Sequence, residues 1–196
     1  MDRIDEVGTP NPAEEKKEKK ELLTTIFDTL EIFCLSVVLV ILIFTFVGRM
    51  ATVVGDSMEP TLQNGDRVLV SSFFYTPECG DIIVVQKESG YYDDQLLIKR
   101  VIAKGGQTIT FDFADWIVYV DGEIVDEPYI NQVLGAMKKG DITGDTVTVP
   151  EGCYFVLGDN RNESADSRFE TVGFVKKTEI VGKAIYRIFP NADKLE

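Results

Sequence analysis

The chemistry open to this chain is limited first by a residue type that it lacks. Its 196 residues include no histidine, which excludes Ser-His-Asp and Cys-His catalysis and removes the commonest metal ligand. The remaining routes to a nucleophile are a Ser or Thr hydroxyl activated by a lysine, a Cys thiolate, or a pair of carboxylates. Three stretches favour the first route: GDSMEPTL around Ser57, LLIKRVIAKGG around Lys99, and LGDNRNESADSR over 157–168.

Ser57 lies in a stretch that suits the display of a hydroxyl group. Gly55 allows a backbone to approach closely, and Pro60 restricts Glu59 and stiffens the exit from the turn. The alternative is that the Ser57 hydroxyl only bonds to its own backbone, as serines in Gly-Asp-Ser turns usually do. Taken by itself, this stretch favours the alternative.

Lys99 is placed among apolar residues. In an extended strand it shares one face with Leu97 and Val101, so its amine would be partly desolvated. Desolvation disfavours the ammonium and lowers the pKa toward neutrality, and a neutral amine can take a proton from a serine hydroxyl. The alternative is a lysine on an edge strand that points to water and guards against aggregation. The spacing alone favours the edge-strand alternative.

The third stretch follows the apolar run CYFVL directly and combines hydroxyls with fixed charges. A neutral amine needs its lone pair aimed, and a hydrogen bond with Ser164 would do that. The alternative is a polar loop with surface ion pairs, which by itself explains the composition at least as well.

An uncharged run over 32–47 predicts a membrane segment. It is slightly shorter than the ~20 residues that span a bilayer, but Leu30 on one side and residues 50–54 on the other extend it. A cleaved signal peptide or a buried core helix are the alternatives, although no small-x-small cleavage site follows the run. The charged run EEKKEKKE before it also allows the helix to continue toward the N-terminus.

Lysines gather before this segment, which predicts that the N-terminus is inside. They are Lys16, Lys17, Lys19 and Lys20. We therefore expect three parts: a cytoplasmic polar tail (1–27), a transmembrane anchor helix (28–50) and an extracytoplasmic β-rich domain (51–196). The chain would be a single-pass protein of the cytoplasmic membrane, in contact with the lipid bilayer.

The remainder of the chain shows the alternating or short apolar runs of β-strands. We expect strands at 67–71, 81–86, 96–103, 108–113, 116–120, 153–157 and 180–188. Asp121 and Gly122 tolerate positive φ and predict a type I′ hairpin. The expected fold class is mainly β, an antiparallel β-sheet catalytic domain on a single N-terminal transmembrane helix.

Charge and cysteine content limit the partners. The 20 Lys and Arg against 33 Asp and Glu give a formal net charge of −13, which argues against a nucleic-acid partner. No pattern indicates a metal or another cofactor. Cys79 and Cys153 could pair in an oxidising compartment, but two cysteines do not establish a disulfide.

Four ordered motifs, GDSMEPTL, IKRVIAKGGQTI, DGEIVDEPYI and GDNRNESADSR, resemble the successive boxes of bacterial type I signal peptidases, which are membrane-anchored Ser/Lys proteases. The resemblance covers nearly all of 30–190, and four motifs in order are far more specific than any one of them. It implies that the chain cleaves signal peptides from exported preproteins after a small-x-small sequence, typically Ala-x-Ala.

The resemblance also implies roles for single residues. Ser57 matches the nucleophile, Lys99 the general base, and Ser164 the hydroxyl that orients the lysine. The supporting residues are the ion pairs Asp166 with Arg168 and Asp159 with Arg100, together with Gly158 and Asn160. Gly55 stands where some members have a serine that donates a hydroxyl to the oxyanion hole, so this chain lacks that side-chain donor and the Ser57 N–H remains.

An extended substrate peptide would add as a strand to an exposed edge and place alternate side chains in two small pockets. Tentative substrate-binding residues are Val53, Gly55, Asp56 and Met58. Phe73, Phe74 and Tyr75 would wall the pockets or touch lipid, and ordinary core packing is the alternative for each apolar residue.

Two other functions compete with this interpretation. A Ser/Lys protease of the repressor-cleaving type shares the dyad, but it normally has a DNA-binding domain where this chain has a membrane anchor. A non-enzymatic, membrane-anchored β-rich module that binds a partner would use the polar loop as its contact surface. The second hypothesis predicts that replacing Ser57 and Lys99 leaves function intact.

Overall fold

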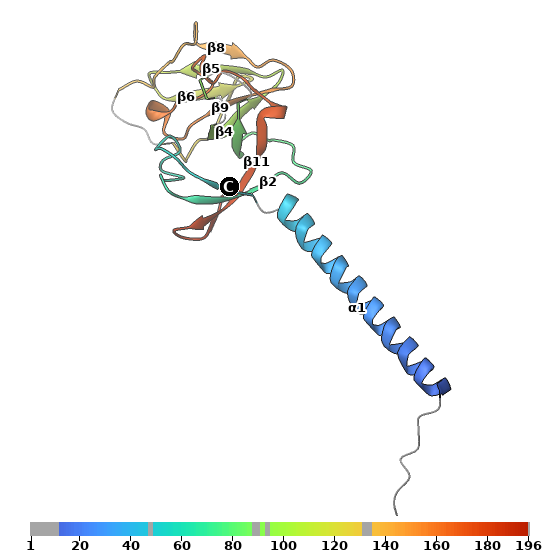
Figure 1. Cartoon of the computed structure of the whole chain (residues 1–196). Helices are drawn as coiled ribbons and strands as arrows, with labels where there is room; N and C mark the ends of the chain where they lie inside the picture. Colours follow the sequence, from blue (N-terminus) through green and yellow to red (C-terminus); the bar gives the residue numbers. More distant parts are fainter. Residues whose placement is uncertain (1–11, 47–48, 88–90, 93–94, 131–134, 196) are drawn as a thin grey trace, which may run out of the picture. The chain divides into compact units, whose positions relative to one another are not determined.

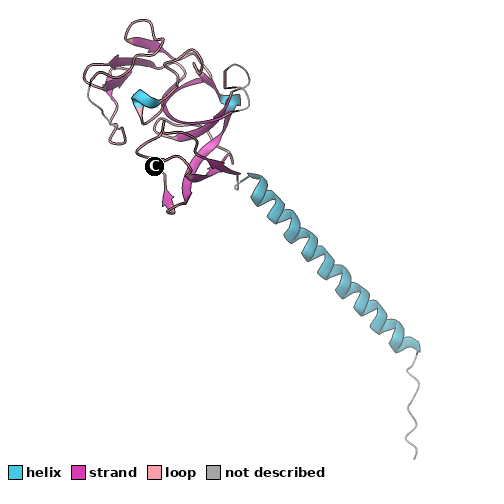
Figure 2. Cartoon of the chain, turned by 60° about the vertical axis from the view of Figure 1, so that its left-hand side comes forward, coloured by secondary structure: helices cyan, strands magenta, loops and turns pink. Residues whose placement is uncertain are grey.

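The computed structural model describes residues 12–46, 49–87, 91–92, 95–130 and 135–195. The chain divides into two compact units, Met1–Thr45 and Phe46–Glu196. The first is helical and the second is built of strands and loops (Figure 2). Each unit is described below by itself.

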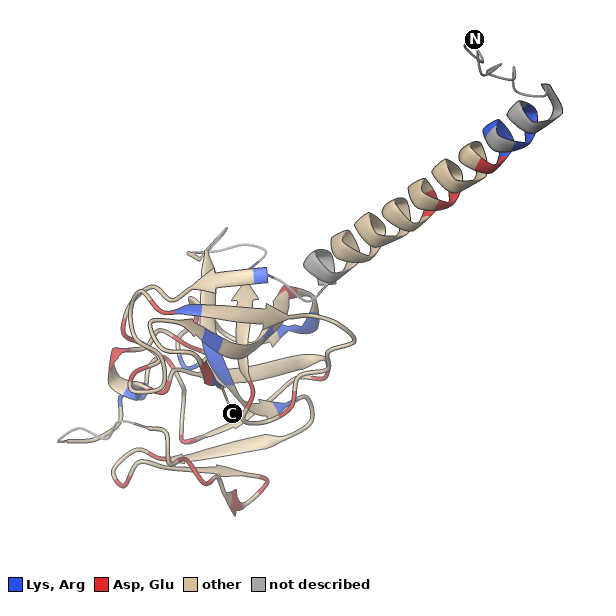
Figure 3. Cartoon of the chain, turned by 90° about the horizontal axis from the view of Figure 1, so that it is seen from below, with Lys and Arg blue, Asp and Glu red and all other residues tan. Residues whose placement is uncertain are grey.

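The first unit is one long helix, α1 (Pro12–Phe46). Its stretch Lys19–Leu42 has the length and composition to cross a membrane, and none of this stretch is buried. At 1.5 Å per residue, 24 residues extend about 36 Å, which exceeds a hydrocarbon core of about 30 Å. Its lysines lie in the N-terminal turns, and the rest is mostly apolar (Figure 3).

Helix α1 differs at both ends from the helix expected over 28–50, and which of its residues span the membrane stays a prediction. The helix begins at Pro12, because the Glu and Lys of the charged run are good helix formers and extend it into the predicted tail. It ends at Phe46, and Arg49 and Met50 lie in a strand where they pair with Val70 and Leu69. Residues 1–11 of the predicted tail lie outside the described residues.

The second unit contains a larger, fully antiparallel sheet (Figure 1). Its strand order is β1-β2-β11-β3-β4-β9-β10, and β12 pairs with β11. The strands are β1 (Arg49–Thr52), β2 (Arg67–Ser71), β3 (Ile82–Gln86), β4 (Leu96–Lys104), β9 (Cys153–Leu157), β10 (Val175–Lys176), β11 (Ile180–Phe189) and β12 (Asp193–Lys194). Strand β4 therefore lies inside the sheet, between β3 and β9.

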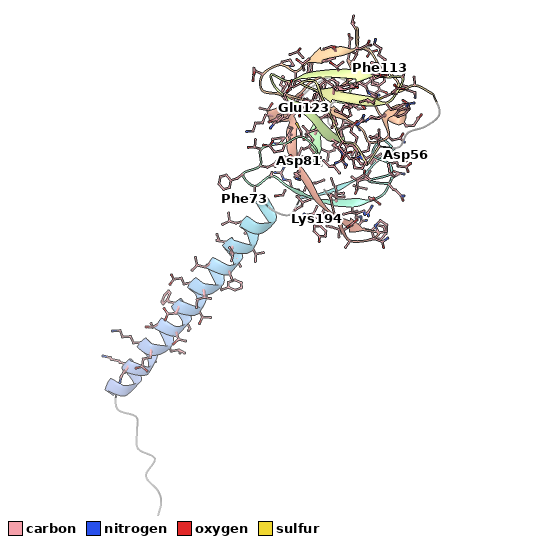
Figure 4. The ribbon with its side chains drawn as sticks, turned by 180° about the vertical axis from the view of Figure 1, so that it is seen from behind. Asp56, Phe73, Asp81, Phe113, Glu123 and Lys194 are labelled. Atoms are coloured by element: carbon pink, nitrogen blue, oxygen red, sulfur yellow. The ribbon has the colours of Figure 1, made fainter. Side chains whose placement is uncertain are left out.

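A smaller sheet has the order β7-β6-β5-β8. Its strands are β5 (Thr108–Asp112), β6 (Ile117–Val120), β7 (Glu123–Ile124) and β8 (Thr146–Thr148). Asp121 and Gly122 have φ of 53° and 86°, as the predicted hairpin turn requires. Two short 3₁₀ helices complete the unit, η1 (Arg161–Glu163) and η2 (Lys177–Glu179). Phe113 and Glu123, beside and within this sheet, lie toward one end of the unit, and Lys194 of β12 lies toward the other (Figure 4).

Every strand predicted from the sequence is present, with bounds within one residue. Trp116 was predicted to begin a strand, but it has a φ of 61° and its indole Nε1 donates to the Gly135 carbonyl at 2.7 Å. The short strands β1, β8, β10 and β12 were missed, because two to four residues carry too little alternation to be recognised. The fold class, mainly antiparallel β with one N-terminal apolar helix, is confirmed.

The core explains where β4 places its side chains. Ile98 packs in a cluster with Val53 and Met58, whereas Val101 packs in a second cluster on other strands. An irregularity in the pairing of β4 with β9 after Val101 turns Ala103 into a third cluster, which lies against the smaller sheet. The side chains of β4 from Ile98 to Ala103 are buried, and this sets the environment of the lysine among them.

Candidate active site

Lys99 lies in the buried middle of β4. Its neighbour across the ladder is Ile83 of β3, and β9 pairs with the strand on the other side. Only 3% of its surface is exposed. The edge-strand alternative is therefore wrong, since this lysine is neither on an edge strand nor directed to water.

Ser57 meets this lysine from a turn that follows β1. The Lys99 Nζ and the Ser57 Oγ are 2.8 Å apart, and the Nζ also donates to the Ile98 carbonyl at 3.0 Å. Gly55, with a φ of 83°, lets the chain turn, and its N–H donates to the Asn64 side chain. The two groups lie at hydrogen-bond distance, which is the geometry of a nucleophile and its base.

Burial sets the protonation of this lysine. Desolvation lowers the pKa of Lys99 from 10.5 to about 8, while the carboxylates of Asp166 and Asp159 raise it. The two carboxylates do not prevail, because each is itself paired with an arginine. About a tenth of the amine is thus neutral at pH 7, against about half near pH 8, and the neutral form is able to accept a proton.

Two buried ion pairs support the loop over 158–168. The Arg100 Nε and Nη2 bind the Asp159 carboxylate at 2.9 and 2.8 Å. The Arg168 Nε and Nη2 bind the Asp166 carboxylate, both at 2.8 Å. All four side chains are at most 3% exposed. The residue pairs expected from the sequence therefore form, and their part in catalysis stays a prediction.

The loop over 158–168 is hydrogen-bonded to the turn that carries Ser57. The Asn160 N–H donates to the Ser57 carbonyl at 3.1 Å, and its side-chain amide donates to the Asp56 carbonyl at 3.2 Å. The Thr61 hydroxyl donates to Asp159 at 2.5 Å. A Cβ on Gly158 would lie 2.4 Å from the Ser57 carbonyl oxygen, so only glycine permits this approach.

Ser164 does not make the contact that was expected of it. Its hydroxyl is buried without a hydrogen-bond partner in the part of the chain that the structure describes, and the hydrogen bonds of the Lys99 Nζ go to Ser57 and Ile98. The hydroxyl packs against the backbone of Gly158, where a Cβ would lie 2.3 Å from its oxygen. The Ser164 side chain thus lies in the loop beside the Ser57 carbonyl rather than on the amine.

A cavity of about 200 Å³ opens beside the Ser57 hydroxyl. It is lined by Val53, Val54, Ser57, Met58, Tyr92, Gln95, Leu96, Leu97, Ile98, Lys99 and Ala165. Val53 and Met58 were predicted to bind substrate and belong to this lining, whereas Gly55 and Asp56 form the turn and are not part of it. A second, mostly apolar cavity of about 370 Å³ also borders Leu96 and includes Ala51, Val84 and Val181.

The apolar residues after the second strand have different surroundings. Phe73 and Phe74 are exposed, at 56% and 93% of their surface, and they belong to neither cavity. Tyr75 donates its hydroxyl to Asp81 at 2.7 Å. Phe73 and Asp81 are labelled in Figure 4.

Sequence reasoning missed Arg161, Glu127 and Tyr129. Arg161 is fully buried and pairs with Glu127, while Tyr129 lies under the Arg100 guanidinium. Arg161 lies within the third stretch, and Glu127 and Tyr129 lie within the motif DGEIVDEPYI, so the motifs contained them. Their contacts join segments that are far apart in the sequence, so the spacing of residues could not predict them.

Cysteines and metal ligands add nothing to the site. Cys79 and Cys153 are both free. In the segments covered by the structure, no group of three or more His, Cys, Asp or Glu residues is arranged to hold a metal ion.

Comparison with known proteins identifies the family. A family model described as "Signal peptidase, peptidase S26" matches residues 26–189. The chain belongs to this signal peptidase family. The family consists of serine endopeptidases that remove signal peptides, and the matched residues include Ser57, Lys99 and the 158–168 loop.

Curated signal peptidases are similar along most of their length. The chain is 41% identical over 160 residues to signal peptidase I of Bacillus caldolyticus, covering 74% of this chain and 81% of that protein. It is 38% identical over 171 residues to the probable signal peptidase I-1 of Synechocystis sp., covering 83% and 82%. A crystal structure of a signal peptidase I from Enterococcus faecalis V583 is 31% identical, with a TM-score of 0.45, and covers 56% of this chain and 97% of that one.

Proposed function

We propose that the chain is a membrane-bound serine endopeptidase that cleaves signal peptides after a small-x-small site such as Ala-x-Ala, with Ser57 as nucleophile and neutral Lys99 as general base. The observation that carries the proposal is the 2.8 Å contact between the Ser57 Oγ and the Nζ of a buried lysine. In a chain without histidine, this amine is the base within reach of the hydroxyl.

Acylation begins with the proton of the Ser57 hydroxyl. The neutral amine of Lys99 accepts it while the Oγ attacks the carbonyl carbon of the scissile peptide bond. The Ser57 N–H donates to the developing oxyanion in this proposal. Collapse of the tetrahedral intermediate breaks the C–N bond, and the Lys99 ammonium gives its proton to the leaving amine. The products are the free mature protein and an ester between the signal peptide and Ser57.

Deacylation uses the same amine a second time. Lys99, neutral again, accepts a proton from a water molecule that attacks the ester carbonyl. Breakage of the C–O bond returns that proton to the Ser57 Oγ and releases the signal peptide as a carboxylic acid. The loop over 158–168 keeps the Ser57 hydroxyl beside the Lys99 amine through both steps. Asp159, Arg100, Asp166 and Arg168 support this loop through their ion pairs.

The two cavities support the choice of substrate. Alternate residues of an extended peptide point to the same side, so a peptide beside β1 would place two side chains in two cavities. The cavity at Ser57, which Val53 and Met58 line, would take the residue before the cleaved bond.

The proposed location is the cytoplasmic membrane, with the N-terminus inside and the β domain outside. Helix α1 has one stretch of membrane-spanning length, and Lys16, Lys17, Lys19 and Lys20 precede the apolar part of it. The partners are then the lipid bilayer and secreted preproteins, and the mechanism uses no metal or other cofactor.

The test is cleavage of a preprotein by the purified full-length chain in detergent. Wild type should cut after a small-x-small sequence, and Ser57→Ala and Lys99→Ala should each abolish cutting while remaining folded. Ser72→Ala and Lys104→Ala, which replace residues of the same types outside the site, should cut like wild type. Failure of folded wild type to cut any of several such preproteins in lipid would overturn the proposal and favour the anchored binding module.

A further inference from the structure

Arg161 joins the 158–168 loop to a segment outside it. Its side chain is fully buried, and its Nε donates to the Gly158 carbonyl at 3.1 Å. Its two terminal nitrogens bind both carboxylate oxygens of Glu127, with 3.1 Å between Nη1 and Oε2. Glu127 follows β7 of the smaller sheet, so this ion pair ties that sheet to the loop.

Arg100 makes a second connection to the same segment. Its guanidinium, which also pairs with the Asp159 carboxylate, lies over the Tyr129 ring, 3.8 Å from the ring centre. The Tyr129 hydroxyl donates to the Glu127 Oε1 at 3.1 Å. The segment 127–129 thus contacts two arginines. Arg161 binds the Gly158 carbonyl, and Arg100 binds the Asp159 carboxylate.

The connections continue to the nucleophile. Gly158 and Asp159 are followed by Asn160, which binds the Ser57 carbonyl, and Asp159 accepts from Thr61 in the same turn. A displacement of the segment 127–129 would therefore pass through the arginines and the loop to the turn that carries the Ser57 hydroxyl.

We propose that Glu127 and Tyr129 are positioning residues of the peptidase, which fix the Ser57 turn against Lys99 through Arg161 and Arg100. The inference rests on the proposed function. Neither residue lines the cavity beside Ser57, so both act through the loop. Because a buried guanidinium needs its carboxylate partner, loss of Glu127 leaves Arg161 to move or to recruit water.

Two kinetic consequences follow from this arrangement. A shift of the serine turn away from the 2.8 Å contact slows the chemical step, since small misplacements cost up to about 10²-fold in rate. Opening the loop also lets water reach Lys99, whose amine faces Ser57 and the ion-paired carboxylates Asp159 and Asp166. Hydration moves the acid limb of the pH–rate profile to higher pH.

The experiment measures cleavage of a short soluble peptide by the full-length chain in detergent. Glu127→Gln and Tyr129→Leu should lower kcat by about tenfold to a hundredfold, with KM within about twofold, because the substrate cavity is untouched. Their acid limbs should lie at higher pH than that of wild type. Tyr129→Phe keeps the ring over Arg100 and loses only the hydroxyl, so it should show a smaller loss.

The control is Asp145→Asn, which breaks an exposed ion pair with Lys139 beside the same smaller sheet. It should keep the wild-type kcat and acid limb. If Tyr129→Phe and the other variants, shown to be folded by circular dichroism at the assay temperature, match wild type in kcat and acid limb, the proposal is overturned. A loss of kcat with an unmoved acid limb also overturns it, because that is a general structural effect. An inactive wild type would overturn the proposed function first.

Discussion

Strand β4 carries two lysines, Lys99 in its middle and Lys104 at its end, and their surroundings are opposite. Lys99 is buried and contacts a hydroxyl and a carbonyl. The Lys104 side chain is 40% exposed, and its Nζ binds the Glu78 carboxylate at 2.5 Å. The pKa of Lys99 is lowered to about 8 by burial, whereas the hydrogen bond with Glu78 raises the pKa of Lys104.

The difference shows that the surroundings of a lysine, rather than its residue type, set its pKa. Lys99 pairs with Ile83 of β3 and is buried from water, and the nearby carboxylates are occupied by arginines. At Lys104, water and an unshared carboxylate both stabilise the ammonium. The same side chain thus has a lowered pKa and a contact with a hydroxyl in one place, and a raised pKa and a surface ion pair in the other.

Replacing each of the two lysines by arginine fixes both positions in the charged form. Arginine stays protonated in proteins, so Lys99→Arg should lower kcat/KM by at least about 10³-fold, as loss of a catalytic base does. Lys104→Arg keeps the surface charge and should stay within about twofold of wild type. Both are measured with the same preprotein and the same detergent.

Circular dichroism of both variants provides the control for folding. Retained cleavage by folded Lys99→Arg would contradict the role of Lys99 as the base. A large loss of kcat/KM in Lys104→Arg would contradict the contrast between the middle and the end of β4.

The strands were predictable because their signals are local. Alternation gave β2 and β5, and continuous apolar runs gave β3 and β9, each to within one residue. Strands of two to four residues, such as β10 and β12, exist only because a neighbour pairs with them. The end of helix α1 had the same cause, since Arg49 and Met50 join β2 although their local sequence continues an apolar run.

The site was predictable in its residue types but not in all its contacts. The three stretches singled out Ser57, Lys99 and the charged loop, and the structure brings them together. The spacing of residues around Lys99 favoured an exposed lysine on an edge strand. It could not predict the burial of Lys99, because that burial depends on the strands that pair with β4. The Glu127 and Arg161 pair likewise joins residues 34 apart in sequence and had no local signal.

The second prediction concerns pH. In the proposed mechanism Lys99 accepts a proton only when it is neutral, and below its pKa the neutral fraction falls tenfold per pH unit. We therefore expect kcat/KM to fall about tenfold per unit below about pH 8 and to level off above it. The Glu78→Gln variant changes only the partner of Lys104 and should leave this limb in place. A profile that is flat on the acid side would contradict the role of Lys99.

The last and smallest effect is on stability. The pKa of Lys99 is lowered in the folded chain from 10.5 to about 8, so the folded state binds fewer protons than the unfolded state between these values. The free energy of unfolding therefore rises with pH across this window, and the contribution is lost as pH falls to about 8. At neutral pH the buried ammonium is then a cost, and Lys99→Met should stabilise the β domain by on the order of 1–3 kcal/mol.

Lys104→Met is the matched variant at the other end of β4, where the amine is exposed and no gain is expected. Both variants are compared with wild type by urea denaturation of the full-length chain at neutral pH and at about pH 10. The gain from Lys99→Met should shrink at the higher pH, because wild-type Lys99 is then already neutral. A Lys99→Met variant less stable than wild type at neutral pH would mean that the contacts of the amine with Ser57 and Ile98 outweigh its desolvation.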